Sequence, residues 1–213
     1  MEPTCLVNPM SALDIELDSY DFLRRYQPGV LDGNEPLDVV KLLDDIFLDK
    51  GFSLQLINDD ELPKAILGVT ELDNKIIKIR ETDYLKCDFE GYQRMTTTHE
   101  VAHSRLHYLQ FEKNGMKMCR TQSNYIPPYV SSEWQARVWA SATLMPFSVI
   151  KKLAVDNYYK NRTELIEAII KKFIVSASAA EARIKTIEKY QQDGRYQEIE
   201  TTIKKRGLFK HNV

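Results

Sequence analysis

The chain contains 213 residues, which is long enough for one sizeable hydrophobic core or for one core with a small helical annex. Its hydrophobic content of 43% and charged content of 28% are ordinary for a globular protein, and a formal net charge of −2 argues against a nucleic-acid binder. Apolar runs extend over only a few residues, so we expect neither a membrane span nor a signal peptide.

The N-terminal part of the chain predicts little regular structure before residue 36. Prolines and glycines are frequent there, and only residues 19–26 favour a short helix. Residues 36–50 favour an amphipathic helix, because their apolar residues recur at helical spacing, Pro36 suits a first turn and Gly51 suits a helix end.

Three segments with β-branched or large apolar residues follow this helix. We expect a strand in each of them, over residues 52–57, 65–72 and 75–80. Asp73 and Asn74 separate the last two segments by a hairpin length and have turn chemistry. The sequence therefore predicts a small, largely antiparallel sheet of three strands.

The second half of the chain is predicted to be mainly helical. A long helix is expected over residues 89–110, followed by a loop over 112–130 that contains glycine and proline. Ser132 and Gln135 fit a capping box for the next helix, which Pro146 ends. Further helices are expected over residues 147–158, 163–173 and 178–191.

These elements indicate an α+β fold, in which a small three-stranded sheet packs on the long helix and a mainly helical C-terminal half follows. We expect four segments: an irregular or short helical N-terminal segment (1–35), a core (36–146), a helical annex (147–193) and a polar tail (194–213). The tail contains several basic residues, and a loose, solvated end is the default expectation for it.

The run His99-Glu100-Val101-Ala102-His103 within the long predicted helix is the clearest chemical signal in the sequence. Histidines four residues apart lie just over one helical turn apart, so both imidazoles project from one face and can bind one metal ion. Zinc suits imidazole nitrogens in a tetrahedral site, and manganese or iron are alternatives where a carboxylate takes part. The simpler interpretation is a helix that carries two histidines without a metal.

Three further residues could contribute to a metal site formed by His99 and His103. Glu100 lies about 100° around the helix from His99, where it can act on a water molecule without taking a coordination position. His107 continues the stripe one turn further, which favours a structural or ligand-supporting role, since the sequence lacks the HExxHxxGxxH pattern. Glu133 begins a later helix, and it is either the third ligand or a carboxylate that favours a helix start.

The cysteines Cys5, Cys87 and Cys119 suggest no competing metal site or redox motif. They are odd in number, widely spaced and include no CxxC pair. We expect them to be buried or incidental thiols, and we expect a reducing cytoplasmic location.

Four stretches of the chain resemble the ImmA/IrrE family of bacterial metallopeptidases. Residues 94–107 (RMTTTHEVAHSRLH) are similar to the family pattern R-F-T-x-A-H-E-[LIV]-[GA]-H-x-x-[LF]-H, and residues 133–146 are similar to E-x-[QE]-A-[ND]-x-F-A-x-x-L-L-M-P. Residues 173–176 with Ala180 and Arg183 resemble a further family pattern, and Gly68 with the strand 76–79 resembles the hairpin before the motif.

This resemblance, which covers roughly residues 36–190, implies a zinc-dependent endopeptidase with His99, His103 and Glu133 as ligands and Glu100 as general base. It also implies a protein substrate, a helix-turn-helix repressor of a phage, mobile-element or stress regulon. The alternative is a metal-dependent regulatory module that sequesters a repressor or toxin partner without cutting it. We expect direct contact with neither nucleic acid nor membrane.

Three residues near the motifs are candidates for contact with a ligand or a substrate. Arg137 stands where the family usually has Asn or Asp, four residues after Glu133, and could pair with a carboxylate. Tyr125 or Tyr129, in the loop before Glu133, could donate an O–H to a developing oxyanion, although tyrosines in such a loop also serve packing.

Overall fold

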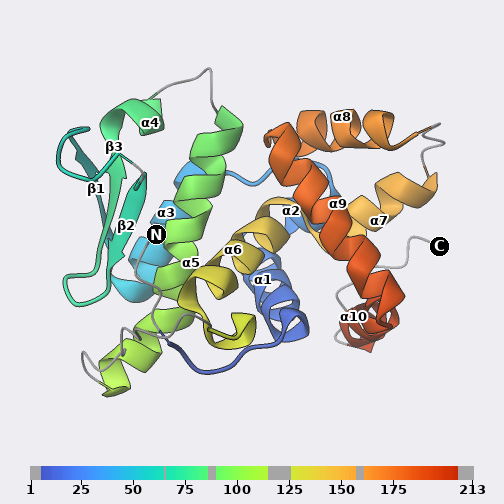
Figure 1. Ribbon diagram of the computed structural model, residues 1–213, viewed down its shortest axis with the longest axis horizontal. Helices are drawn as coiled ribbons and strands as arrows, with labels where there is room; N and C mark the ends of the chain where they lie inside the picture. Colours follow the sequence, from blue (N-terminus) through green and yellow to red (C-terminus); the bar gives the residue numbers. More distant parts are fainter. Residues whose placement is uncertain (1–5, 65, 86–89, 115–125, 157–160, 206–213) are drawn as a thin grey trace. The chain divides into compact units, whose positions relative to one another are not determined.

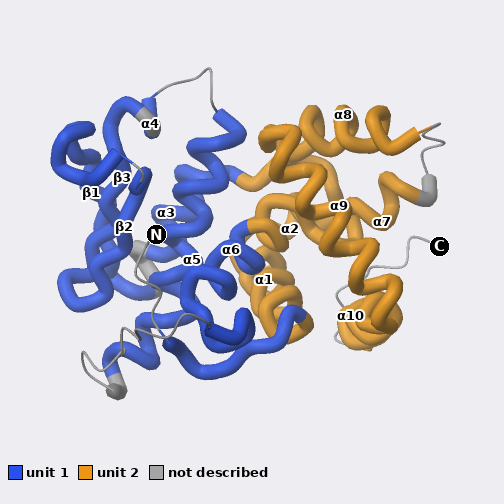
Figure 2. Tube along the Cα trace, in the orientation of Figure 1, with its two compact units in different colours: residues 1–12, 38–140 blue, residues 13–37, 141–213 orange. Residues whose placement is uncertain are grey.

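The computed structural model describes residues 6–64, 66–85, 90–114, 126–156 and 161–205. The chain divides into two compact units (Figure 2): unit 1 comprises residues 1–12 and 38–140, and unit 2 comprises residues 13–37 and 141–213. Among the described residues no helix is long and apolar enough to cross a membrane. All three cysteines, and the thiol roles expected for them, lie outside the described ranges.

Unit 1 contains a small sheet that packs on a long helix (Figure 1). The helix α5 contacts β2, β3 and α3, while the short helix α4 contacts β1 and β3. This arrangement confirms the predicted α+β class. The elements of the unit are α3 (Val39–Lys50), β1 (Ser53–Ile57), β2 (Gly68–Glu71), β3 (Ile76–Arg80), α4 (Glu81–Leu85), α5 (Glu90–Asn114), the 3₁₀ turn η2 (Pro128–Val130) and most of α6 (Ser132–Leu144).

The sheet is mixed, because its strands lie in the order β1-β3-β2. β2 pairs antiparallel with β3, as the hairpin predicts, and places Glu71 opposite Ile76; β1 pairs parallel with β3 and places Ser53 opposite Ile76. Strand direction alternates along the chain, but β1 and β3 lie next to each other in the sheet. The expected antiparallel pairing therefore holds for β2 with β3, and β1 pairs parallel with β3. The central position suits β3, whose Ile77 and Ile79 are almost completely buried.

The apolar stripe predicted for α3 packs against α5. Leu42, Leu43 and Ile46 are buried at helical spacing. Gly51 follows the helix with a φ of 71°, a left-handed conformation that glycine adopts without steric cost. The predicted helix and its end are therefore confirmed, although the helix begins at Val39 rather than Pro36.

Unit 2 is helical, and a buried ion pair joins its first and last parts. Arg183 and Glu16 are fully buried, and Arg183 Nη2 donates to Glu16 Oε2 at 3.0 Å. Arg183 Nε also donates to the carbonyl oxygen of Met145 at 3.0 Å. The helices of this unit are α1 (Ala12–Tyr26), α2 (Pro28–Asp32), the end of α6, α7 (Phe147–Asp156), α8 (Arg162–Phe173), α9 (Ala177–Gln192) and α10 (Arg195–Lys205).

The end of the described chain is helical where a loose tail was expected. Ile199 and Ile203 of α10 lie one turn apart and are fully buried, and the helix contacts α9. The residues around these two isoleucines are mostly charged or polar, so the short apolar stripe is not evident from the sequence. Two buried isoleucines at this spacing are nevertheless enough to dock one face of a short helix.

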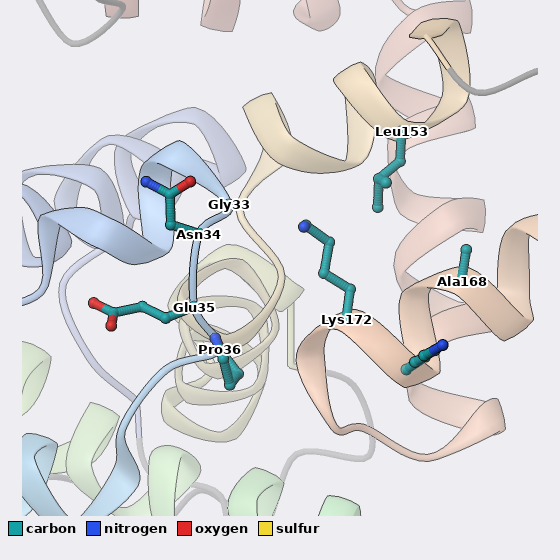
Figure 3. A pocket seen from close by; sticks show the side chains of 8 residues that line it. Gly33, Asn34, Glu35, Pro36, Leu153, Ala168 and Lys172 are labelled. Carbon is teal, nitrogen blue, oxygen red and sulfur yellow. The ribbon is translucent and has the colours of Figure 1, made fainter.

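A pocket of about 380 Å³ lies in unit 2 (Figure 3). Lys172 extends across it toward Gly33, and the Lys172 Cε atom lies 3.2 Å from where a Cβ on Gly33 would be. The charged residues that line it are two lysines and one glutamate, and this mixed charge defines no ligand class. Its lining residues are Gly33, Asn34, Glu35, Pro36, Leu153, Ala168, Lys171 and Lys172.

Candidate metal centre

The three side chains predicted as metal ligands come together between α5 and α6. His99 and His103 lie one turn apart on α5, and Glu133 lies in the first turn of α6. The two Nε2 atoms are 3.1 Å apart, and the carboxylate oxygens of Glu133 are 3.2 Å from His99 Nε2 and 3.4 Å from His103 Nε2. One ligand atom from each of the three side chains therefore lies within 4.8 Å of the other two.

The separations of these atoms fit a tetrahedral metal site. Donors about 2.0–2.1 Å from a zinc ion in tetrahedral geometry are about 3.3 Å from one another, which is close to the 3.1 Å between the two Nε2 atoms and to the 3.2 Å between His99 Nε2 and Glu133 Oε2. Two imidazole nitrogens and one carboxylate oxygen suit zinc and also suit manganese or iron. The three side chains are only partly buried, so an ion held by them would stay accessible to a water molecule or a substrate group.

The ionisation of Glu133 agrees with such a role. Burial of its carboxyl group raises the pKa, but hydrogen bonds with His103 and His99 outweigh this effect and hold the pKa well below its usual range. The carboxylate is therefore ionised, as a metal ligand must be.

Glu133 is positioned by a helix cap one residue earlier than predicted. The Ser131 Oγ atom accepts a hydrogen bond from the backbone N–H of Trp134 at 3.2 Å, and the Ser131 carbonyl accepts one from the backbone N–H of Gln135. The expected capping box from Ser132 to Gln135 is therefore wrong. The amide of Gln135 is engaged by other groups instead.

Glu100 follows His99 on α5, and its side chain faces β2. The carboxyl group is largely buried, and the hydroxyl of Thr70 lies 2.7 Å from Glu100 Oε2. Gly68, on the same strand, leaves room for this side chain, because a Cβ there would lie 2.9 Å from Glu100 Cγ. The strand thus fixes the position of the carboxylate that the motif marks as a general base.

His107 touches His103 on the side away from Glu133. Its Nδ1 lies 3.1 Å from His103 Nδ1, and its Nε2 lies 3.1 Å from Gln135 Oε1. The imidazole is fully buried, and this burial, together with the neighbouring His103, lowers the pKa of His107 to about 3. His107 is therefore neutral near neutral pH and lies outside the group of three.

The remaining candidates take less part in this geometry. Arg137 is exposed, and it forms no ion pair with any carboxylate in the described ranges. Tyr129 is about half exposed, and it contributes to the centre through its backbone carbonyl, which accepts a hydrogen bond from Gln135. Tyr125 lies outside the described residues.

Two contributors to the centre have no signature in local spacing. Thr70 is 30 residues from Glu100 in sequence, and Gln135 is 28 residues from His107. Gln135 does carry one indirect signal, since it stands next to Ala136 on the buried side of α6. A buried glutamine needs hydrogen-bond partners, so its position on this face could have suggested that Gln135 forms hydrogen bonds inside the protein.

Comparisons with known proteins bear on the fold of the chain. No family model matches it, and no curated protein matches it. Among solved structures, a Mycobacterium tuberculosis transcriptional regulator is similar, with a TM-score of 0.52 and 14% sequence identity. The similarity covers 82% of this chain and 47% of the regulator, so the chain spans about half the length of that protein. At this identity, the two chains are shown to share a fold.

Proposed function

We propose that this chain is a zinc-dependent endopeptidase of the ImmA/IrrE type. The observation that carries the proposal is the meeting of His99, His103 and Glu133, with Glu100 held in position directly after His99. A site that only bound a metal ion would not need this buried carboxylate. The donor set favours zinc and would also accept manganese or iron.

Each residue of the centre then has a defined task. His99, His103 and Glu133 would hold the ion, which when bound supplies the Lewis acidity that polarises a scissile carbonyl and acidifies water. Glu100 accepts the proton of the attacking water and delivers it to the nitrogen of the leaving amine. Thr70 holds the carboxylate of Glu100 in position to accept the proton.

The strand β2 provides a surface for an extended peptide. In the described sheet it pairs with β3 on one side only, and its Thr70 touches Glu100. A peptide that added to this edge through main-chain hydrogen bonds would bring a backbone carbonyl close to the base. We infer that the substrate is a helix-turn-helix repressor of a phage, mobile-element or stress regulon, and the support for this is the resemblance of the motifs.

The test of hydrolysis uses the purified repressor that is encoded beside the gene of this chain. The zinc-loaded protein should cleave it, and Glu100→Gln should abolish cleavage while it retains stoichiometric zinc, because a glutamine oxygen can still accept from Thr70. Glu112→Gln changes an exposed carboxylate on the same helix and should cleave like the wild type. Equal cleavage by wild type and Glu100→Gln would overturn the proposal.

The metal centre has a separate test. His99→Ala should remove stoichiometric zinc from the purified protein, as measured by elemental analysis after dialysis, because two donors remain of the three that meet. Unchanged zinc content in this variant would refute the site.

A second function is favoured by one observation, the fold shared with a protein described as a transcriptional regulator. In this alternative the chain is a metal-dependent regulatory module that binds a repressor or toxin partner without cutting it. It predicts a zinc-dependent complex with the intact partner on size-exclusion chromatography, and the complex should be insensitive to Glu100→Gln.

A further inference from the structure

The side chain of Gln135 has one orientation that satisfies its surroundings. Its Nε2 donates to the backbone carbonyl oxygens of Asn8 and Tyr129, both at 2.8 Å. Carbonyl oxygens only accept hydrogen bonds, so the reversed amide would place Oε1 against two acceptors. Gln135 is fully buried, so water does not relieve that repulsion, and Oε1 must face His107.

This orientation determines which nitrogen of His107 carries a proton. Gln135 Oε1 only accepts, so His107 Nε2, at 3.1 Å, is the donor. The imidazole is fully buried between an amide and another imidazole, where the charged form would be poorly solvated. A neutral imidazole has one N–H, so His107 Nδ1 is left with a lone pair.

The position of the His107 proton in turn determines which nitrogen of His103 is protonated. His103 Nδ1 lies 3.1 Å from His107 Nδ1, which has no proton to give, so His103 Nδ1 donates. In the neutral form of His103 the lone pair is then on Nε2, which faces His99 Nε2 and Glu133 Oε1. Metal ligation requires a lone pair at this atom.

The N-terminal segment 6–10 anchors this chain of hydrogen bonds. The backbone N–H groups of Val7 and Met10 donate to the carbonyl oxygens of Val130 and Tyr129 at 3.0 and 2.9 Å. The backbone N–H of Asn8 donates to Gln110 Oε1 of α5 at 2.7 Å. The segment is thus fixed both to η2, just before α6, and to the helix that carries the histidines, which sets the position of the Asn8 carbonyl.

We propose that His107 and Gln135 are positioning residues that set the tautomer of His103 for metal binding, with the segment 6–10 as their anchor. The inference rests on the metal centre of the proposed function and deepens it. Neither residue belongs to the group of three, and both act through His103.

The tautomers can be read in the wild-type protein without any substitution. Nitrogen-15 NMR of the metal-free protein, recorded at a pH at which each of these imidazoles carries one proton, should show His103 protonated at Nδ1 and His107 protonated at Nε2. The opposite tautomer at His103 would overturn the inference. This measurement also decides the matter if a variant fails to fold.

Substitution then tests the consequence for the metal. Gln135→Met keeps the length of the side chain and removes its hydrogen bonds, and it should weaken zinc affinity about tenfold in a chelator competition and abolish the preference for one His103 tautomer. Gln93→Met is the matched control, because Gln93 is a glutamine on the same helix as the histidines and takes no part in the described hydrogen bonds of the centre. It should leave both readouts unchanged.

The outcomes separate this inference from the proposed function. Zinc affinity and tautomers that are unchanged in Gln135→Met would overturn the inference and leave the peptidase proposal standing. A wild-type protein that binds no zinc would overturn both.

Discussion

The hydroxyl of Thr70 donates a hydrogen bond to the carboxylate of Glu100 across 2.7 Å, from an edge strand to the helix that carries both histidines of the metal centre. The same hydroxyl lies 2.9 Å from the backbone carbonyl oxygen of Glu100. A hydroxyl has one proton, so these two acceptors compete for it. When the carboxylate takes up a proton it becomes the weaker acceptor, and the hydroxyl can turn to the carbonyl without losing a partner.

Replacing Thr70 by valine should therefore slow peptide cleavage without removing the metal. A hydrogen bond to a charged group contributes about 1.5–3 kcal/mol, which corresponds to a fall in kcat of roughly ten- to hundredfold if the bond orients the base. Thr70→Ser retains the hydroxyl and should stay within a few-fold of the wild type. Repressor cleavage and zinc content measured side by side would test this, and a valine variant as active as the serine variant would contradict it.

Gly68→Ala should disturb the same carboxylate by a steric route. The added Cβ would lie 2.9 Å from Glu100 Cγ and 3.1 Å from the carbonyl oxygen of Lys78, so the Glu100 side chain or the strand must shift. Overpacking of this kind costs about 1–3 kcal/mol. We expect a lower free energy of unfolding in urea together with weaker cleavage. An alanine variant with wild-type stability and activity would show that the contact is relieved at little cost.

The sequence predicts those parts of the centre that depend on local periodicity. The spacing of His99 and His103 places both rings on one face, and a helix start identifies Glu133 as a candidate partner. The contacts that surround these residues depend on pairings between distant segments. The bond from Gln135 to Asn8 spans 127 residues, and no helical or strand period records it.

The same distinction applies to the fold. Helix α3 is predicted with its end at Gly51, because both signals lie within one segment. The position of β1 beside β3 is not predicted, because strand order depends on which strand is best buried rather than on which strands are joined by a short turn. Likewise, the docking of α10 depends on Ile199 and Ile203 finding a buried surface, which their polar neighbours in sequence do not suggest.

His107 should make the stability of the metal-free protein depend on pH. Burial, with the neighbouring His103, lowers its pKa from 6.5 to about 3, so the folded protein keeps it neutral while the unfolded chain takes up a proton below about pH 6.5. The unfolded state therefore binds more protons in this range. The free energy of unfolding should fall as the pH decreases from about 6.5 toward 3, by at most about 1.4 kcal/mol per pH unit from this group.

A comparison with His107→Gln isolates this contribution. Urea unfolding between about pH 6.5 and 4.5 avoids most of the range in which Glu133, whose pKa is lowered from 4.5, also loses its stabilising effect on acidification. The variant should be less stable near neutral pH but should show a shallower dependence on pH in this window. Parallel slopes for the two proteins would contradict the assignment.

Breaking the buried pair of Arg183 and Glu16 by replacing one partner should lower stability far more than breaking an exposed pair in the same unit. Both side chains are fully buried, so Arg183→Leu would leave the carboxylate of Glu16 without its charge partner and should lower the free energy of unfolding by about 3–5 kcal/mol. Arg162→Leu, which removes an exposed pair with Glu188, should cost less than about 1 kcal/mol.

The double variant Glu16→Leu with Arg183→Leu distinguishes an unpaired buried charge from a lost packing contact. If the cost of Arg183→Leu comes from leaving Glu16 unpaired, removal of that charge should recover much of the lost stability, since an apolar pair of similar volume replaces an ion pair at little net cost. Full recovery is not expected, because Arg183 Nε also satisfies the carbonyl oxygen of Met145, and leucine cannot. A double variant less stable than Arg183→Leu would show that packing around the two side chains, rather than their charge, holds α1 and α9 together.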